Sequence, residues 1–149
     1  MAIVKANYLR SGGGSRIGRS VDYYGWREGT EVERTWHAAD GRELDQDAAK
    51  DEIAGKAEEA PYTYRVVLST REAELDADDY AAVLDERFDD WYFTTHLEGD
   101  HPHAHAVAFR DERLDRDDLA DLRERLGELE RAHEQALEQA PEAELEPGE

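Results

Sequence analysis

The chain has 149 residues, of which 38 are Asp or Glu and 18 are Lys or Arg, and it contains no cysteine. This length fits one domain with a modest core, and the lack of cysteine excludes disulfides, thiolate nucleophiles and Cys-ligated zinc. No apolar run approaches the ~20 residues that span a bilayer and no signal-peptide pattern opens the chain, so we expect a cytoplasmic protein without a membrane partner.

The net charge of −20 is unevenly distributed along the chain. Such a surface is typical of proteins adapted to very high salt, where ions screen the repulsion between carboxylates. We therefore expect an extremely halophilic source. Residues 1–29 instead carry five basic residues against two acidic ones, a balance of +3. This positive segment is where we expect an anionic partner to dock.

The first half of the chain alternates short strands and helices. In chain order we predict a strand over 2–8, a flexible Ser/Gly loop over 11–15, a helix over 16–26 and a strand over 30–37. A turn at 39–41 then precedes a polar helix, which Asp45 or Asp47 caps and Pro61 ends.

The second half begins with the strand pattern over 62–70 and a helix over 78–88 with Asp76 as its N-cap. A long helix starts at Asp115 or Asp117, and its leucine stripe should pack on the sheet, although its length leaves self-association open. We therefore predict one α+β domain over 1–140, with four or five antiparallel strands and helices on one face. An acidic, disordered tail should follow over 141–149.

Four of the six histidines lie in the ten residues from His96 to His105. His101, His103 and His105 alternate, so on a strand they project from one face. If the run before them pairs antiparallel around a turn at 98–101, His96 faces His103 with their Cβ atoms ~5 Å apart. Because neutral imidazoles bind divalent metals well, this spacing predicts a metal site of His96, His103 and His105, with His101 at its rim.

This run reads His-Leu-Glu-Gly-Asp-His-Pro-His-Ala-His and closely resembles the metal motif of plasmid mobilisation relaxases, members of the HUH endonuclease superfamily. In that family the first histidine and the last two hold a divalent cation. The resemblance thus implies a relaxase-like fold with Mg²⁺ or Mn²⁺ on His96, His103 and His105. Ala104 departs from the family pattern, because a bulkier hydrophobic residue usually stands between the last two histidines.

A second motif near the N-terminus resembles the nucleophile region of the same family. The run from Tyr24 to Gly29 fits the pattern Tyr-x-x-Arg-(Glu/Lys)-Gly. The resemblance implies that a tyrosine attacks single-stranded DNA at a plasmid or viral origin and forms a covalent phosphotyrosine. Tyr24 is favoured as the nucleophile, and the adjacent Tyr23 remains an alternative.

Other residues would support this reaction. Glu98, Asp100 and His101 could orient the metal ligands from the turn. The DNA phosphates would contact three arginines of the positive segment, namely Arg16, Arg19 and Arg27.

Two other functions remain open at this point. The run from His101 to Val107 also fits the His-x-His-x-His-x-x pattern of histidine-triad nucleotide hydrolases, which use a histidine nucleophile without metal. That pattern explains neither His96 nor Tyr24. A catalytically inactive DNA-binding accessory protein of replication or mobilisation is the third possibility, and metal-dependent cleavage would separate it from the enzyme.

Overall fold

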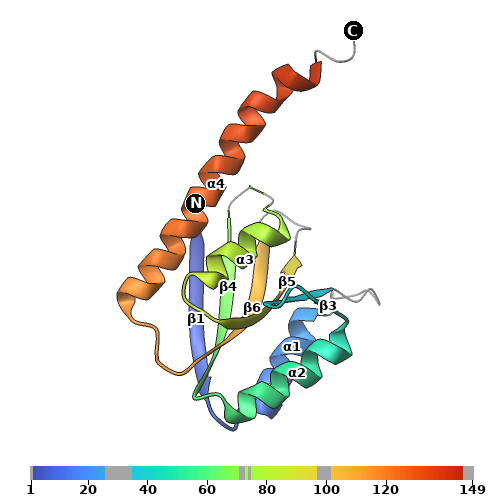
Figure 1. Ribbon diagram of the computed structural model, residues 1–149, viewed down its shortest axis with the longest axis vertical. Coiled ribbons are helices and arrows are strands. Elements are labelled where there is room, and N and C mark those ends of the chain that lie inside the picture. Colours follow the sequence, from blue (N-terminus) through green and yellow to red (C-terminus); the bar gives the residue numbers. More distant parts are fainter. Residues whose placement is uncertain (1, 26–34, 71–72, 74, 97–101, 146–149) are drawn as a thin grey trace.

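The computed structural model describes residues 2–25, 35–70, 73, 75–96 and 102–145. Its centre is a six-stranded antiparallel sheet with the strand order β1-β4-β6-β5-β2-β3 (Figure 1). The strands are β1 (Ile3–Arg10), β2 (Trp36–Ala38), β3 (Glu43–Leu44), β4 (Tyr62–Ser69), β5 (Asp90–His96) and β6 (His103–Arg110). The helices are α1 (Gly14–Gly25), α2 (Gln46–Glu59), α3 (Ala77–Asp85) and α4 (Arg116–Leu145). The predicted α+β fold is confirmed, with six strands in the described residues where we expected four or five.

Helices cover both faces of the sheet, which corrects the prediction that they lie on one face. One core joins α3 and α4 to the sheet, with Leu84, Leu122 and Leu126 fully buried. The other joins α1 and α2 to the opposite face through Ile17 and Ile53. The reason is that alternate residues of the central strands are apolar on both sides: Ala106 and Ala108 of β6 face the first core, whereas Val107 and Phe109 face the second.

The predicted caps and the predicted turn at 39–41 are found in the structure, whereas the turn predicted at 98–101 lies outside the described residues. Asp45 accepts a hydrogen bond from the Ala48 N–H and starts α2, while Asp76 forms a capping box at the start of α3. Asp115 accepts a hydrogen bond from the Asp118 N–H at the start of α4. In the hairpin between β2 and β3, Gly41 has a φ of +92°, a left-handed conformation that glycine adopts without strain.

Helix α1 starts inside the segment that we predicted to be a flexible loop. The Gly14 N–H donates to the Glu58 carboxylate (3.1 Å), so this side chain of α2 caps the start of α1. A Cβ added at Gly14 would lie 2.7 Å from the Ala54 carbonyl oxygen. The glycines therefore let α1 approach α2 closely, which is why this segment is helical from Gly14 onward.

The leucine stripe of α4 packs on the sheet as predicted, and the helix extends beyond the sheet (Figure 1). It continues to Leu145 and so overlaps the segment predicted as a tail over 141–149. Self-association through this helix stays a prediction. None of the helices in the described residues combines the length and the apolar character that a bilayer crossing requires.

Candidate functional site

The hairpin of β5 and β6 places His96 opposite His103, the register that the sequence predicts. His105 follows on the same face of β6, and one nitrogen from each of the three rings lies within 4.8 Å of the others. The ring centroids are 4.7 to 4.9 Å apart and all three side chains are half-buried. These histidines form a cluster that could bind a metal ion.

Tyr24, at the end of α1, lies directly on this cluster. Its ring stacks on the His105 ring with a centroid distance of 4.3 Å and an interplanar angle of 8°. The Tyr24 carbonyl oxygen is 2.8 Å from Nε2 of His96. The chain thus brings together two sequence motifs that lie 72 residues apart.

The contact with the Tyr24 carbonyl determines which nitrogen of His96 carries a proton. A carbonyl oxygen only accepts hydrogen bonds, so Nε2 of His96 must be the donor. In the neutral imidazole Nδ1 then carries the lone pair that a metal ligand requires. Metal-binding histidines commonly donate their other N–H to a backbone carbonyl in this way. The donor set and this contact both fit a divalent cation.

The position of Tyr24 depends on a buried glutamine at the start of α2. The Gln46 side chain donates to the Val21 carbonyl of α1 (2.9 Å) and accepts from Nε1 of Trp36 (2.7 Å). It therefore joins α1, α2 and β2 beneath the last turn of α1. Lys50 adds an ion pair to Asp22 on the same turn.

Arg65 on β4 is a residue near the site that the sequence analysis did not single out. Its Nε donates to the Asn7 side chain (2.7 Å) and its Nη1 donates to the Ser20 hydroxyl (3.2 Å). Ser20 also makes a side-chain hydrogen bond with Tyr24 one turn further along α1. The sequence contains a signal for Arg65, because a charged residue in the middle of an apolar strand pattern is unusual.

The surroundings act in opposite directions on the Tyr24 hydroxyl. Burial raises its pKa, and this is the largest effect, to which the neighbouring Tyr23 adds. The positive charge of Arg65 and the hydrogen bond with Ser20 lower the pKa and partly offset the burial. Arg65 and Ser20 therefore favour the ionised hydroxyl.

The other predicted site residues have different positions. Tyr23 points away from the cluster, and 79% of its surface is exposed. Arg16 and Arg19 are exposed on α1, where Arg19 lines a groove between α1 and α2 with Lys50. Four predicted site residues lie outside the described residues: Arg27, Glu98, Asp100 and His101.

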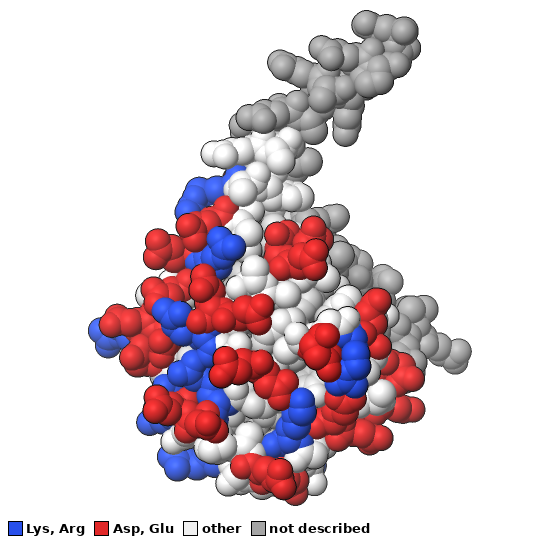
Figure 2. All heavy atoms as spheres, in the orientation of Figure 1, with Lys and Arg blue, Asp and Glu red and all other residues white. Residues whose placement is uncertain are grey.

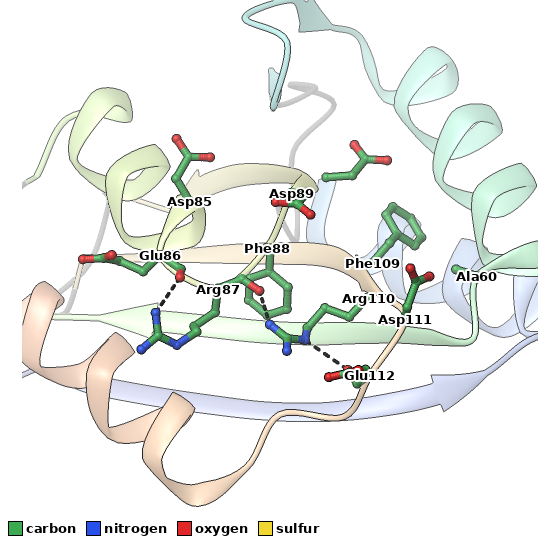
Figure 3. A pocket seen from close by; sticks show the side chains of 11 residues that line it. Ala60, Asp85, Glu86, Arg87, Phe88, Asp89, Phe109, Arg110, Asp111 and Glu112 are labelled. Atoms are coloured by element: carbon green, nitrogen blue, oxygen red, sulfur yellow. Dashed lines mark hydrogen bonds between the residues drawn. The ribbon is translucent and has the colours of Figure 1, made fainter.

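A cavity of about 560 Å³ lies at the other end of β5 and β6, roughly 23 Å from the histidines along β6 (Figure 3). Six of its lining residues are acidic. Its two arginines are already engaged: Arg87 contacts Asp118 and Asp121, and Arg110 donates to the carbonyls of Arg87 and Glu112. This cavity therefore suits a polyanion poorly, in contrast to the histidine cluster.

Comparison with protein-family models, with curated proteins and with solved structures found no match to this chain. The geometry of the site and the two sequence motifs are therefore the basis for inferring its function.

Proposed function

We propose that this protein is a metal-dependent endonuclease that nicks and rejoins single-stranded DNA, with Tyr24 as the nucleophile. The observation that carries the proposal is the stacking of Tyr24 on His105, at the edge of a three-histidine cluster. The motif at His96–His105 and the tyrosine motif resemble those of relaxases, and the two motifs meet in the fold. Tyr23 is the weaker candidate, because its ring is directed to solvent.

A divalent cation on His96, His103 and His105 would polarise the oxygens of a bound phosphate. The family resemblance implies Mg²⁺ or Mn²⁺. Of these two ions, Mn²⁺ suits an all-nitrogen donor set better. Mg²⁺ prefers oxygen ligands and binds imidazole nitrogens more weakly than Mn²⁺ does.

In the proposed reaction the Tyr24 hydroxyl oxygen attacks phosphorus. The bond between phosphorus and the Tyr24 oxygen forms as the bond to the leaving oxygen of the DNA breaks. The hydroxyl proton of Tyr24 is released, and the leaving oxygen takes up one proton, so charge balances. The phosphotyrosine retains the energy of the phosphodiester, so the reverse attack can rejoin the strand.

The histidine-triad alternative uses neither His96, which belongs to the cluster, nor Tyr24, which stacks on it. The inactive accessory protein differs from our proposal only in lacking the covalent step. A single experiment can therefore test the three possibilities together.

The experiment incubates the protein in molar KCl with Mn²⁺ and labelled single-stranded DNA that carries candidate origin sequences, and then detects covalent adducts on a denaturing gel. We expect an adduct with the parent protein and with Tyr23→Phe, and none with Tyr24→Phe, since that change removes only the attacking oxygen. Cleavage without an adduct in all three proteins would contradict a tyrosine nucleophile. If Tyr24→Phe forms an adduct and Tyr23→Phe does not, the nucleophile is Tyr23.

A further inference from the structure

One corner of the sheet beside the histidine cluster has exposed side chains. The register of the strands places three rows of side chains across this face, and the outer ends of these rows lie on β1 and β4. Ile3, Lys5 and Asn7 of β1 are exposed, whereas their neighbours on β4 are half-buried. We call these six residues the β1–β4 corner: Ile3, Lys5, Asn7, Arg65, Val67 and Ser69.

Every side chain in the three rows is neutral or basic. The rows continue from the β1–β4 corner onto β6 and β5, where they reach the histidine cluster, Thr94, Val107 and Tyr92. About a quarter of the whole chain is acidic, with 38 Asp and Glu in 149 residues. A stretch of sheet without carboxylates is therefore unusual in this protein, and it adjoins the site where a phosphate would react.

No carboxylate of the described residues forms an ion pair with the Arg65 guanidinium in this corner. Within the described ranges, five other cations contact at least one carboxylate, namely Arg42, Lys50, Lys56, Arg87 and Arg125. Arg65 instead donates hydrogen bonds to the neutral side chains of Asn7 and Ser20. Asn7 is the only asparagine in the chain.

Lys5 adds a second positive charge. It pairs in register with Val67, so it is a diagonal neighbour of Arg65 on the adjacent strand, at a Cβ separation of roughly 7–8 Å that long side chains can bridge. The same row leads through Val67 to His105, two strand spacings or roughly 10 Å away. By the same geometry Arg65 is a diagonal neighbour of His105 at roughly 7–8 Å, so both cations lie beside the reacting phosphate and not on it.

We propose that the β1–β4 corner binds a backbone phosphate of the DNA strand adjacent to the one at the histidine cluster. Arg65 is the direct ligand, held in place by Asn7 and Ser20, and Lys5 supplies the second charge. The inference rests on the proposed function for the identity of the anion. The DNA strand would then run from the histidine cluster over the β1–β4 corner towards β1.

The test measures binding and not cleavage. The parent for this test carries Tyr24→Phe and is kept in a metal chelator, so that no covalent step occurs. Binding of a short fluorescent single-stranded oligonucleotide is followed by anisotropy over a KCl series in which circular dichroism shows the protein folded. We expect Arg65→Gln to weaken binding by about tenfold and to lower the salt slope by about one.

Arg10→Gln is the matched control, because it removes the same charge from the same sheet. Arg10 lies at the other end of β1, where its guanidinium is over the Tyr62 ring, 5.8 Å from the centroid. We expect this variant to bind DNA as the parent does. If Arg65→Gln and Arg10→Gln bind equally, the proposed role of the corner is wrong.

Asn7→Asp provides a second variant that keeps the shape of the corner. It preserves the acceptor for Nε of Arg65 but adds a carboxylate that neutralises the guanidinium. If Arg65 binds phosphate, DNA affinity falls although Arg65 is unchanged. If Arg65 is only structural, Asn7→Asp leaves DNA affinity intact, which would overturn the proposal even where Arg65→Gln does not fold.

These outcomes separate the corner from the nuclease function. If the protein forms the Tyr24 adduct but neither Arg65→Gln nor Asn7→Asp changes DNA binding, the proposed nuclease function is supported and the proposed role of the β1–β4 corner is wrong. If DNA binding depends on Arg65 but no adduct forms, the role of the corner is supported and the nuclease function is wrong. A parent that binds no DNA at all contradicts both.

Discussion

At the scale of single residues, the cluster depends on how His96 is held. Its Nε2 donates to the Tyr24 carbonyl, so in the neutral imidazole Nδ1 carries the lone pair. The tyrosine is therefore tied to the cluster twice, through its ring on His105 and through its carbonyl. Binding of a metal and positioning of the nucleophile are coupled through this one residue.

We expect one Mn²⁺ site per chain in a calorimetric titration. Loss of an outer partner of a metal ligand typically costs 10–100-fold in affinity, so His103→Ala, which removes a direct ligand, should cost more than about 100-fold. His96→Ala should weaken binding as well. His133→Ala on α4 is the control of the same residue type outside the cluster, and it should bind Mn²⁺ as the parent does. Equal affinity in all three variants would contradict the metal site.

A second prediction concerns Gln46, which is buried and joins Trp36 to α1. Gln46→Leu leaves the buried Trp36 N–H without its acceptor, at a cost of about 1–3 kcal/mol. Urea unfolding should show this loss, whereas Gln135→Leu at an exposed position of α4 should change the free energy of unfolding little. Because α1 loses its anchor, the Gln46 variant should also form less Tyr24 adduct at equal folded concentration.

The site was only partly predictable from the sequence. Strand alternation places His103 and His105 on one face, and the antiparallel register of β5 and β6 places His96 opposite His103, so local geometry sufficed for the histidines. Arg65 and Asn7 needed the order of the strands, because β4 and β1 reach this face only through long-range pairing with β6. Periodicity within a strand does not contain that information.

At the scale of secondary-structure elements, α1 is the element that brings the nucleophile to the sheet. Its direction depends on close contact with α2, where Gly14 meets the Ala54 carbonyl and Glu58. Caps and leucine stripes indicated α2, α3 and α4, since these signals are local. The start of α1 was missed because glycines usually indicate loops, whereas here their lack of a side chain permits helix contact.

A pair of glycine substitutions tests this interpretation. In Gly14→Ala the new Cβ would lie 2.7 Å from the Ala54 carbonyl, so α1 must shift and we expect a loss of about 1–3 kcal/mol in the free energy of unfolding. Gly55→Ala is the matched control on α2, since a Cβ there meets nothing within 4 Å. It should stabilise the protein by about 0.4–1 kcal/mol. Urea unfolding in KCl measures both, and a neutral Gly14→Ala would show that the α1–α2 contact is loose.

At the scale of the whole molecule, the charge determines the conditions under which the fold is stable. Acidic side chains dominate the face shown in Figure 2, with Lys and Arg between them. The ion pairs that the structure describes leave their side chains 22–56% exposed. Such surface pairs contribute about 0–1 kcal/mol each. They are too weak to offset the mutual repulsion of a chain with a net charge of −20.

We therefore expect the free energy of unfolding to rise with KCl up to molar concentrations. Salt weakens the surface ion pairs and the carboxylate repulsion together, and the excess of acidic residues makes the loss of repulsion the larger effect. Thermal unfolding over a KCl series measures this, and KCl is preferred to sulfate, which strengthens apolar burial by itself.

A variant with three exposed carboxylates neutralised should unfold at a higher temperature in low salt than the parent, and its unfolding temperature should depend less steeply on KCl. The three substitutions are Glu43→Gln, Asp51→Asn and Glu124→Gln. If the parent is equally stable in dilute buffer and the triple variant gains nothing there, repulsion between carboxylates does not limit this fold, and the expectation of a salt-adapted surface is wrong.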